Sequence, residues 1–183
     1  MPHVPIHLNA ERYNFLIIGG GKVGERRVKK LLEAGAKVTL ISKEFSQGLE
    51  ELDHKSLVKI KKTVEKNEIE DLINDFDVII AATDDKSLNE YIERIARKNK
   101  KLVNRADSVE SDFIFPSWIV RNDIVVSIST QGKNPLLSKH LRERVEKELD
   151  LMTREKTRNY LNRKERKKVP CMPVLEEISH GNN

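Results

Sequence analysis

Short apolar runs alternate with amphipathic segments of helical length over the first 105 residues. The run 13–18 is apolar and β-prone, and the segment 25–34 repeats apolar residues at helical spacing. The same alternation continues, with strand-like runs at 37–41, 57–64, 77–82 and 101–104 and helix-like segments at 45–54, at 69–76 and from Ser87. Strands separated by helix-length gaps pair in parallel through right-handed crossovers. The pattern therefore predicts an α/β domain with a parallel sheet.

The pattern changes near residue 113. The segment 124–129 alternates apolar with small polar residues, as a half-buried strand does. Asn134 and Pro135 provide a cap and a first-turn proline for a helix. That helix carries an apolar stripe made of Leu137, Leu141, Val145 and Leu149. We interpret residues 113–149 as a small α+β region that serves as an interface or a lid, and the stripe predicts an isologous dimer.

Composition limits the class of protein. Of the 183 residues, 34% are charged and 38% hydrophobic, and no apolar run approaches the roughly 18 residues of a membrane span. The start of the chain lacks a signal-peptide pattern, and Cys171 is the only cysteine, so we expect a cytoplasmic protein. The net charge of +5 and the 5% aromatic content do not indicate a nucleic-acid partner.

Basic residues concentrate near the C-terminus, and we interpret residues 150–183 as a basic helical segment. Two interpretations of its charge remain open, because a solvated helix face and an electrostatic attraction for an anionic ligand both explain it.

Three glycines separate the first predicted strand from the first predicted helix. Gly19, Gly21 and Gly24 occupy the positions of a G-x-G-x-x-G motif. The first permits the tight turn, the second lets a pyrophosphate approach the backbone, and the third lets the helix pack close to the strand. Phosphates would bind at the helix N-terminus, so we expect residues 1–112 to form a Rossmann-type nucleotide-binding domain. The alternative is a glycine turn that only allows close packing.

Polar clusters follow three of the predicted strands, at 42–44, 83–85 and 104–108. Ligands collect at the carboxyl ends of such strands, so we include Thr83 and Asp84 among the cofactor-binding candidates. Glu44 lies two residues beyond the usual position of the ribose-binding acid, and Lys43 would suit a 2′-phosphate, so NAD and NADP both remain open. The alternative for residues 83–85 is that they only start a helix, although Ser87 and Glu90 form a capping-box pattern for that helix.

Five stretches together resemble one family. They are Leu16–Arg27, Ala81–Asp85, Asn104–Asp107, Asp112–Ser117 and Val126–Pro135. In this order and spacing they resemble precorrin-2 dehydrogenase, of the siroheme-synthase N-terminal type, from about Ile6 to Leu149. The Phe-Pro-Ser stretch and the Ser-Thr-x-Gly-x-x-Pro stretch are the specific ones, because the glycine motif is common to many families.

The resemblance implies an NAD-dependent oxidation of precorrin-2 to sirohydrochlorin, on the route to siroheme, by a homodimer. It places NAD contacts at Lys22, Val23, Lys43 and Glu44, a key acid at Asp107, and a serine-rich loop at Ser129 and Thr130. Some members also insert ferrous iron into sirohydrochlorin, so a bifunctional dehydrogenase and ferrochelatase is an alternative. Members with a fused methyltransferase are much longer, and we expect no such activity in this chain.

The chemistry agrees with these residues. Asp107 follows a predicted strand beside the cofactor site and suits a general base; the alternative is that it only starts a turn or caps residues 108–111. The substrate carries many carboxylates, which Arg105, Lys133 and the C-terminal basic segment would bind.

The histidines show no ligand spacing and no Cys-x-x-Cys pair exists, so we expect no protein-built metal site. A non-catalytic NAD-sensing module is the alternative from another class.

Overall fold

The computed structural model describes residues 3–121 and 124–167, with side chains described as far as residue 152. The chain divides into two compact units: one holds the residues up to Pro116 together with Thr130–Asn134, and the other holds Ser117–Ser129 and the chain from Pro135. The expected functional boundaries at 112/113 and 149/150 stay predictions. The last helix, α5 (Pro135–Lys167), continues through residue 150 without a break.

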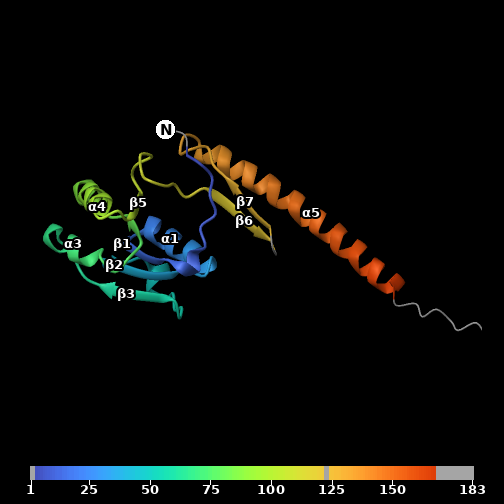
Figure 1. The fold of residues 1–183 in the computed structure, drawn as a ribbon, viewed down its shortest axis with the longest axis horizontal. Helices are drawn as coiled ribbons and strands as arrows, with labels where there is room; N and C mark the ends of the chain where they lie inside the picture. The colour runs from blue at the N-terminus through green and yellow to red at the C-terminus, as the bar shows by residue number, and fades with distance from the viewer. Residues whose placement is uncertain (1–2, 122–123, 168–183) are drawn as a thin grey trace, which may run out of the picture. The chain divides into compact units, whose positions relative to one another are not determined.

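The first unit is built on a five-stranded parallel sheet (Figure 1). Its strands are β1 (Asn14–Gly20), β2 (Lys37–Phe45), β3 (Leu57–Lys61), β4 (Val78–Ala81) and β5 (Leu102–Arg105). They lie in the order β3-β2-β1-β4-β5, and every neighbouring pair is parallel. This order reverses direction between β1 and β4, which is the switch point of a doubly wound sheet. The Rossmann-type prediction is confirmed.

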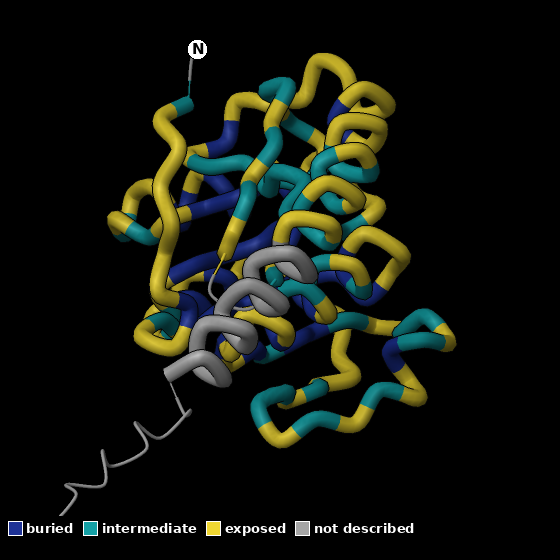
Figure 2. The backbone as a smooth tube through the Cα atoms, turned by 90° about the vertical axis from the view of Figure 1, so that its right-hand side faces the viewer, coloured by how far each residue is buried: buried dark blue, intermediate teal, exposed yellow. Residues whose placement is uncertain are grey.

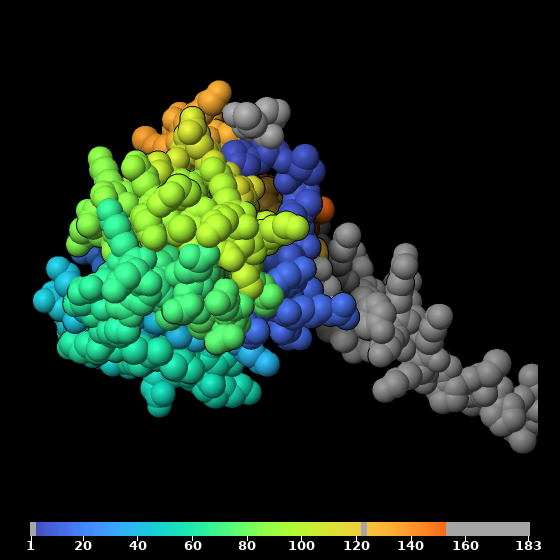
Figure 3. Space-filling model, turned by 60° about the vertical axis from the view of Figure 1, so that its left-hand side comes forward, coloured from blue at the N-terminus to red at the C-terminus, as the bar shows by residue number. Residues whose placement is uncertain are grey.

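Helices cover both faces of this sheet, because successive β1 side chains point to opposite sides. Phe15 and Ile17 pack in the cluster that includes α1 (Lys22–Glu33) and Leu49 of α2 (Gln47–Glu50). Leu16 and Ile18 pack in a second cluster with residues of α3 (Ile69–Leu72) and α4 (Lys86–Lys98). Two short 3-10 helices complete the unit: η1 (Ala10–Arg12) precedes β1, and η2 (Lys66–Glu68) precedes α3. Strand β1 after its first residue and β4 throughout are buried, and buried residues are dark blue in Figure 2. The residues of α3 and α4 gather on one face in Figure 3.

The helix expected at 45–54 is much shorter, since α2 spans only Gln47–Glu50. Strand β2 continues to Phe45, which pairs with Gly20, so the first predicted turn of the helix is extended. The Lys59 ammonium then donates to the carbonyl oxygens of Leu49, Glu50 and Leu52 at 2.8, 3.0 and 2.9 Å. These three bonds satisfy the carbonyls where a longer helix would have continued.

The predicted capping box of α4 is wrong. Asp85 is the N-cap, and its Oδ1 accepts from the Leu88 backbone N–H at 3.1 Å. Ser87 lies inside the helix, where its hydroxyl accepts from the Lys66 ammonium at 2.7 Å. The helix therefore starts two residues earlier than the Ser-x-x-Glu pattern indicates, because Asp85 and not Ser87 is its N-cap.

The second unit contains a two-stranded antiparallel hairpin and α5. Strand β7 (Ile124–Ile128) was expected, whereas β6 (Ser117–Arg121) was not. Arg121 joins the hairpin to α5, because its Nε lies 2.9 Å from Asp150 Oδ1 and its guanidinium also pairs with Glu146. These bonds, that to Asp150 first, raise the pKa of Arg121. Within the described residues, no helix combines the length and apolar character that crossing a bilayer requires.

Replacement of Gly24 by alanine should destabilise the first unit. An ideal Cβ at Gly24 would lie 2.0 Å from the Gly19 carbonyl oxygen, which belongs to the backbone and cannot rotate away. We expect Gly24→Ala to lower the free energy of unfolding by about 1–3 kcal/mol, although alanine is the better helix former. Urea unfolding measures this change. A Gly24→Ala variant as stable as the parent would contradict the close approach of α1 to β1.

Candidate functional site

The glycine loop between β1 and α1 is confined by backbone on two sides. Gly19 has a φ of +118°, and a Cβ there would lie 2.2 Å from the Ala82 carbonyl oxygen. A Cβ at Gly20 would lie 2.4 Å from the Glu44 carbonyl oxygen. A Cβ at Gly21, in contrast, would have no atom within 4 Å. Space therefore opens at the position where a pyrophosphate must reach the backbone.

The first turn of α1 completes a cradle for an anion. Gly21 is the N-cap, and the backbone N–H groups of the first helical residues have no partner within the helix. Lys22 and Val23 belong to this turn and are exposed. The N–H groups and the helix dipole suit the pyrophosphate of a dinucleotide, so the residues present fit NAD(P).

The end of β2 lies beside this cradle. The Ser46 backbone N–H donates to the Gly20 carbonyl oxygen at 2.8 Å, so the chain turns next to the glycine loop. Lys43 and Glu44 immediately precede that turn and are exposed. The structure thus brings both predicted ribose-side residues next to the predicted phosphate-side residues.

An acid in the first turn of α1 is held by partners of its own. The Glu25 carboxylate accepts from the Lys29 ammonium and from the Ser46 hydroxyl, each at 2.6 Å. These hydrogen bonds, that from Lys29 first, lower the pKa of Glu25. The carboxylate therefore stays ionised, pairs with a cation and joins α1 to the end of β2.

The loop after β4 is held by a buried side chain that the sequence analysis did not identify. Asn89 is 1% exposed, and its Oδ1 accepts from the Thr83 hydroxyl at 2.7 Å and from the Thr83 backbone N–H at 3.1 Å. Its Nδ2 donates to the Thr83 carbonyl oxygen at 2.9 Å. Thr83 is thus bonded within the loop, whereas Asp84 is exposed. The sequence does contain an indication of this role, because Asn89 is a polar residue on the apolar face of the helix that carries Ile92 and Ile95.

Asp107 lies in the turn that follows β5. The backbone N–H of Ala106 donates to the Ala81 carbonyl oxygen at 2.9 Å, so this turn begins next to the end of β4. Asp107 Oδ1 lies 2.9 Å from Arg105 Nε, and the Asp107 side chain keeps 25% of its surface exposed. The carboxylate therefore lies near the carboxyl end of β4 and is partly accessible to solvent.

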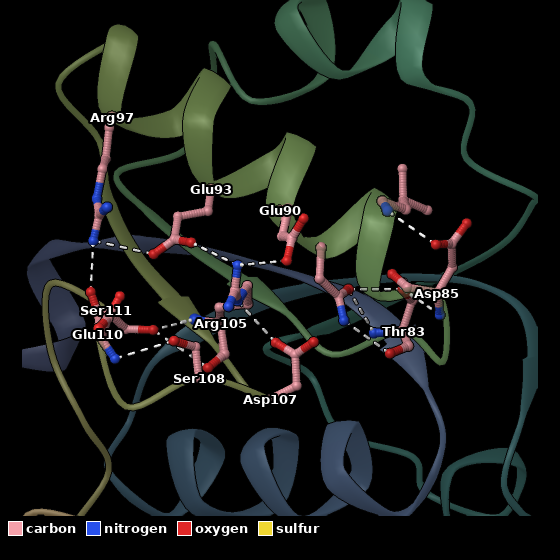
Figure 4. Close-up of polar contacts among 12 residues, drawn as sticks. Thr83, Asp85, Glu90, Glu93, Arg97, Arg105, Asp107, Ser108, Glu110 and Ser111 are labelled. Carbon is pink, nitrogen blue, oxygen red and sulfur yellow. Dashed lines mark hydrogen bonds and ion pairs between the residues drawn. The ribbon is translucent and has the colours of Figure 1, made fainter.

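Arg105 has carboxylate neighbours from α4 as well (Figure 4). Its NH1 lies 3.2 Å from Glu93 Oε2 and 3.5 Å from Glu90 Oε1. The substrate-binding role expected for Arg105 remains a prediction. In this structure its guanidinium faces three carboxylates of its own chain.

The loop 130–134 packs on the segment that follows Asp107. A Cβ at Gly132 would lie 2.7 Å from Val109 Cγ1, which is two residues beyond Asp107. The Thr130 hydroxyl donates to the Asn134 carbonyl oxygen at 2.9 Å and shapes the loop that carries Lys133. Ser129 belongs to the second unit.

The aromatic stretch before Pro116 packs on α1. The Arg27 guanidinium carbon lies 4.1 Å from the centre of the Phe115 ring, and burial lowers the pKa of Arg27 to about 10. The Phe113 carbonyl oxygen accepts from Asn104 Nδ2 at 2.8 Å. These contacts tie residues 113–115 to β5 and to the helix of the phosphate cradle.

Across the described residues, no group of three or more histidine, cysteine, aspartate or glutamate side chains is placed to hold a metal ion. Cys171 and His180 lie outside the described residues.

Comparison with known proteins agrees with this geometry. Residues 6–117 match the NAD_binding_7 family, described as "Putative NAD(P)-binding". The chain is 38% identical over 148 residues to the precorrin-2 dehydrogenase of Methanosarcina barkeri, covering 78% of this chain and 65% of that protein. It is also 38% identical over 148 residues to the siroheme synthase of Methylococcus capsulatus, covering 80% of this chain and 30% of that protein.

A solved structure, "SirC, precorrin-2 dehydrogenase", superposes with a TM-score of 0.65 at 28% identity, covering 80% of this chain and 71% of that one. This chain thus spans about two thirds of the dehydrogenase relative and less than a third of the siroheme synthase. The similarity includes the glycine loop, the strand ends and the aromatic stretch described above, so the chain belongs to the precorrin-2 dehydrogenase family of the siroheme-synthase N-terminal type.

Proposed function

We propose that this protein catalyses the NAD-dependent dehydrogenation of precorrin-2 to sirohydrochlorin in siroheme biosynthesis. One observation carries the proposal: the glycine cradle and Asp107 follow β1 and β5, whose carboxyl ends lie at the same edge of the sheet on either side of β4. A dinucleotide site and an accessible carboxylate are what a dehydrogenation that also releases a proton needs. We place the enzyme in the cytoplasm, in keeping with its single cysteine.

The proposed NAD site follows the glycine loop and the two neighbouring strand ends. The pyrophosphate lies on the first turn of α1, and Glu44 is the acid available to the ribose hydroxyls. The complete set is Gly19, Gly21, Lys22, Val23, Gly24, Lys43, Glu44, Thr83 and Asp84. Of these, Thr83 contributes by shaping the loop, because Asn89 engages its hydroxyl and both backbone polar groups.

The oxidation removes a hydride and a proton from the macrocycle. Bound NAD supplies the hydride acceptor. The Asp107 carboxylate accepts the proton and becomes a neutral carboxylic acid, which later returns the proton to water. Lys133, on the loop beside Val109, binds substrate carboxylates by charge. Thr130 contributes by shaping that loop, because its hydroxyl donates to the Asn134 carbonyl oxygen. Ser129 is the further substrate-binding residue of the proposal.

We propose that the second unit forms an isologous homodimer. Ile119 is its one buried apolar side chain among the residues whose burial the structure describes. Val120, Leu137 and Leu141, by contrast, are 52%, 46% and 41% exposed. A hairpin and a helix that bury so little apolar surface gain most by covering it with a second copy.

An anaerobic assay with precorrin-2 tests the function. We expect oxidation only when NAD is present, and Asp107→Asn should lower kcat by about 10²–10⁴-fold because it removes the proton acceptor without changing its size. Absorbance of the product follows the reaction, and a single cooperative melting transition of the variant shows that the fold is kept. Addition of ferrous or cobaltous ion to the product then tests metal insertion. Binding of NAD without turnover would favour a sensing module instead.

Gly21→Ala tests the cofactor cradle. Its Cβ has no protein atom within 4 Å and the residue already has an extended backbone, so the free energy of unfolding should stay within about 0.5 kcal/mol. The methyl group would occupy the space needed by the pyrophosphate, so we expect the Kd for NAD to rise at least about tenfold. Fluorescence titration measures this affinity. Unaltered NAD binding would argue that the glycine turn serves packing alone.

Sedimentation at micromolar concentration tests the dimer. We expect twice the chain mass for the parent and the chain mass for Leu141→Glu, since a carboxylate would be buried at the interface. Lys147→Glu, an exposed change on the same helix, introduces the same residue and should remain dimeric. A monomeric parent would overturn the dimer.

A further inference from the structure

Arg105 is fixed by its own chain at both ends. Its backbone N–H donates to the Ser111 hydroxyl at 2.7 Å, and Ser111 is 5% exposed. Its guanidinium reaches Glu93 at 3.2 Å on one side and Asp107 at 2.9 Å on the other (Figure 4). Glu93 is itself 8% exposed and holds a second cation, with Arg97 NH2 3.0 Å from its Oε1. The order of charges is therefore Arg97, Glu93, Arg105, Asp107.

These neighbours make Arg105 a poor site for a carboxylated substrate. Three carboxylates, those of Glu90, Glu93 and Asp107, face this one guanidinium. A further anion approaching Arg105 would meet like charges at close range and would have to displace one of them. Only 19% of the Arg105 side chain is exposed, so a substrate group also has little surface to reach.

The contact with Asp107 can hold that carboxylate in place. It joins Nε, the least mobile nitrogen of the guanidinium, to one oxygen of Asp107. The Nε–H is not in line with that oxygen, so the contact is an ion pair rather than a hydrogen bond. A partly buried ion pair of this kind restricts where the carboxylate sits, while the rest of Asp107 remains accessible.

We propose that Arg105 is a positioning residue: it holds the Asp107 carboxylate at the carboxyl-end edge of the sheet, and Glu93 in turn holds Arg105. This inference rests on the proposed function, in which Asp107 accepts the proton. Misplacing a reacting group by about 1 Å costs on the order of 10²-fold in rate, so loss of Arg105 should appear in kcat. Because Arg105 does not bind the substrate in this proposal, KM for precorrin-2 should stay nearly constant.

A double-mutant cycle in the full chain tests this role. The variants are Arg105→Gln, Asp107→Asn and both together, and kcat and KM are measured for each. We expect Arg105→Gln to lower kcat about 10–100-fold in the parent and less than about twofold when Asp107→Asn is already present. Arg105→Lys should restore part of kcat, since it keeps the charge without the planar fork.

Arg97→Gln is the matched control. Arg97 also pairs with Glu93, at 3.0 Å, and its Nε bonds to Asp112 Oδ1 at 2.9 Å, but it lies one step further along the row of charges. Loss of this cation should lower the melting temperature and leave kcat within about twofold, because the ion pair of Asp107 remains.

Each other outcome overturns the inference in a distinguishable way. A raised KM with an unchanged kcat would make Arg105 a substrate-binding residue, and equal losses of kcat in both Asp107 backgrounds would make it structural. An active Asp107→Asn variant would remove the proton-acceptor role itself. If the parent does not oxidise precorrin-2, the proposed function fails. The same double-mutant cycle, measured by melting temperature, still tests the ion pair between Arg105 and Asp107. Additive losses of melting temperature would then overturn it.

Discussion

The close approach of three backbone segments at the glycine loop is the constraint on which the site depends. A Cβ at Gly19 would collide with the Ala82 carbonyl oxygen, and a Cβ at Gly24 would collide with the Gly19 carbonyl oxygen. The end of β4 and the start of α1 can therefore meet at the end of β1 only if both positions are glycine. This contact places the N-terminus of α1 at the carboxyl ends of the strands, where its dipole and free N–H groups suit the pyrophosphate of the proposed cofactor.

The residues expected to touch the ligand are held by others that need not touch it. Asn89 on α4 satisfies the polar groups of Thr83, and Ser46 joins Glu25 to the end of β2. Arg105 does the same for Asp107 by charge. A site built this way loses little conformational entropy when it binds a ligand, because hydrogen bonds and ion pairs within the chain already order its loops. The buried amide and the ion pairs contribute more to the order of these loops than to overall stability.

The sequence predicted the elements whose causes are local. The apolar run of β1, the glycines and the spacing of Val28 and Leu31 lie within 20 residues, so the strand, turn and helix could be read directly. The end of α2 depends on Lys59 of β3, the strand beside β2, because its ammonium binds the carbonyl oxygens of Leu49 and Glu50. Nothing between residues 45 and 54 indicates this contact. Strand β6 was missed because it is recognisable only through pairing with β7.

The candidate site residues show the same difference between local causes and contacts that are distant in the sequence. Positions such as Gly21 could be assigned from the sequence, because the need for a residue without a side chain is set by the local turn. Arg105 could not, because a positive charge at a strand end suits an anionic substrate as well as a neighbouring acid, and its spacing from Glu93 on α4 does not distinguish them. Two of the three carboxylates around it, those of Glu90 and Glu93, come from α4 and reach Arg105 only through the packing of α4 on β5. Since that arrangement uses the Arg105 charge within the chain, other cations have to bind the substrate's carboxylates, and Lys133, on the loop whose Gly132 packs against Val109, is the one we propose.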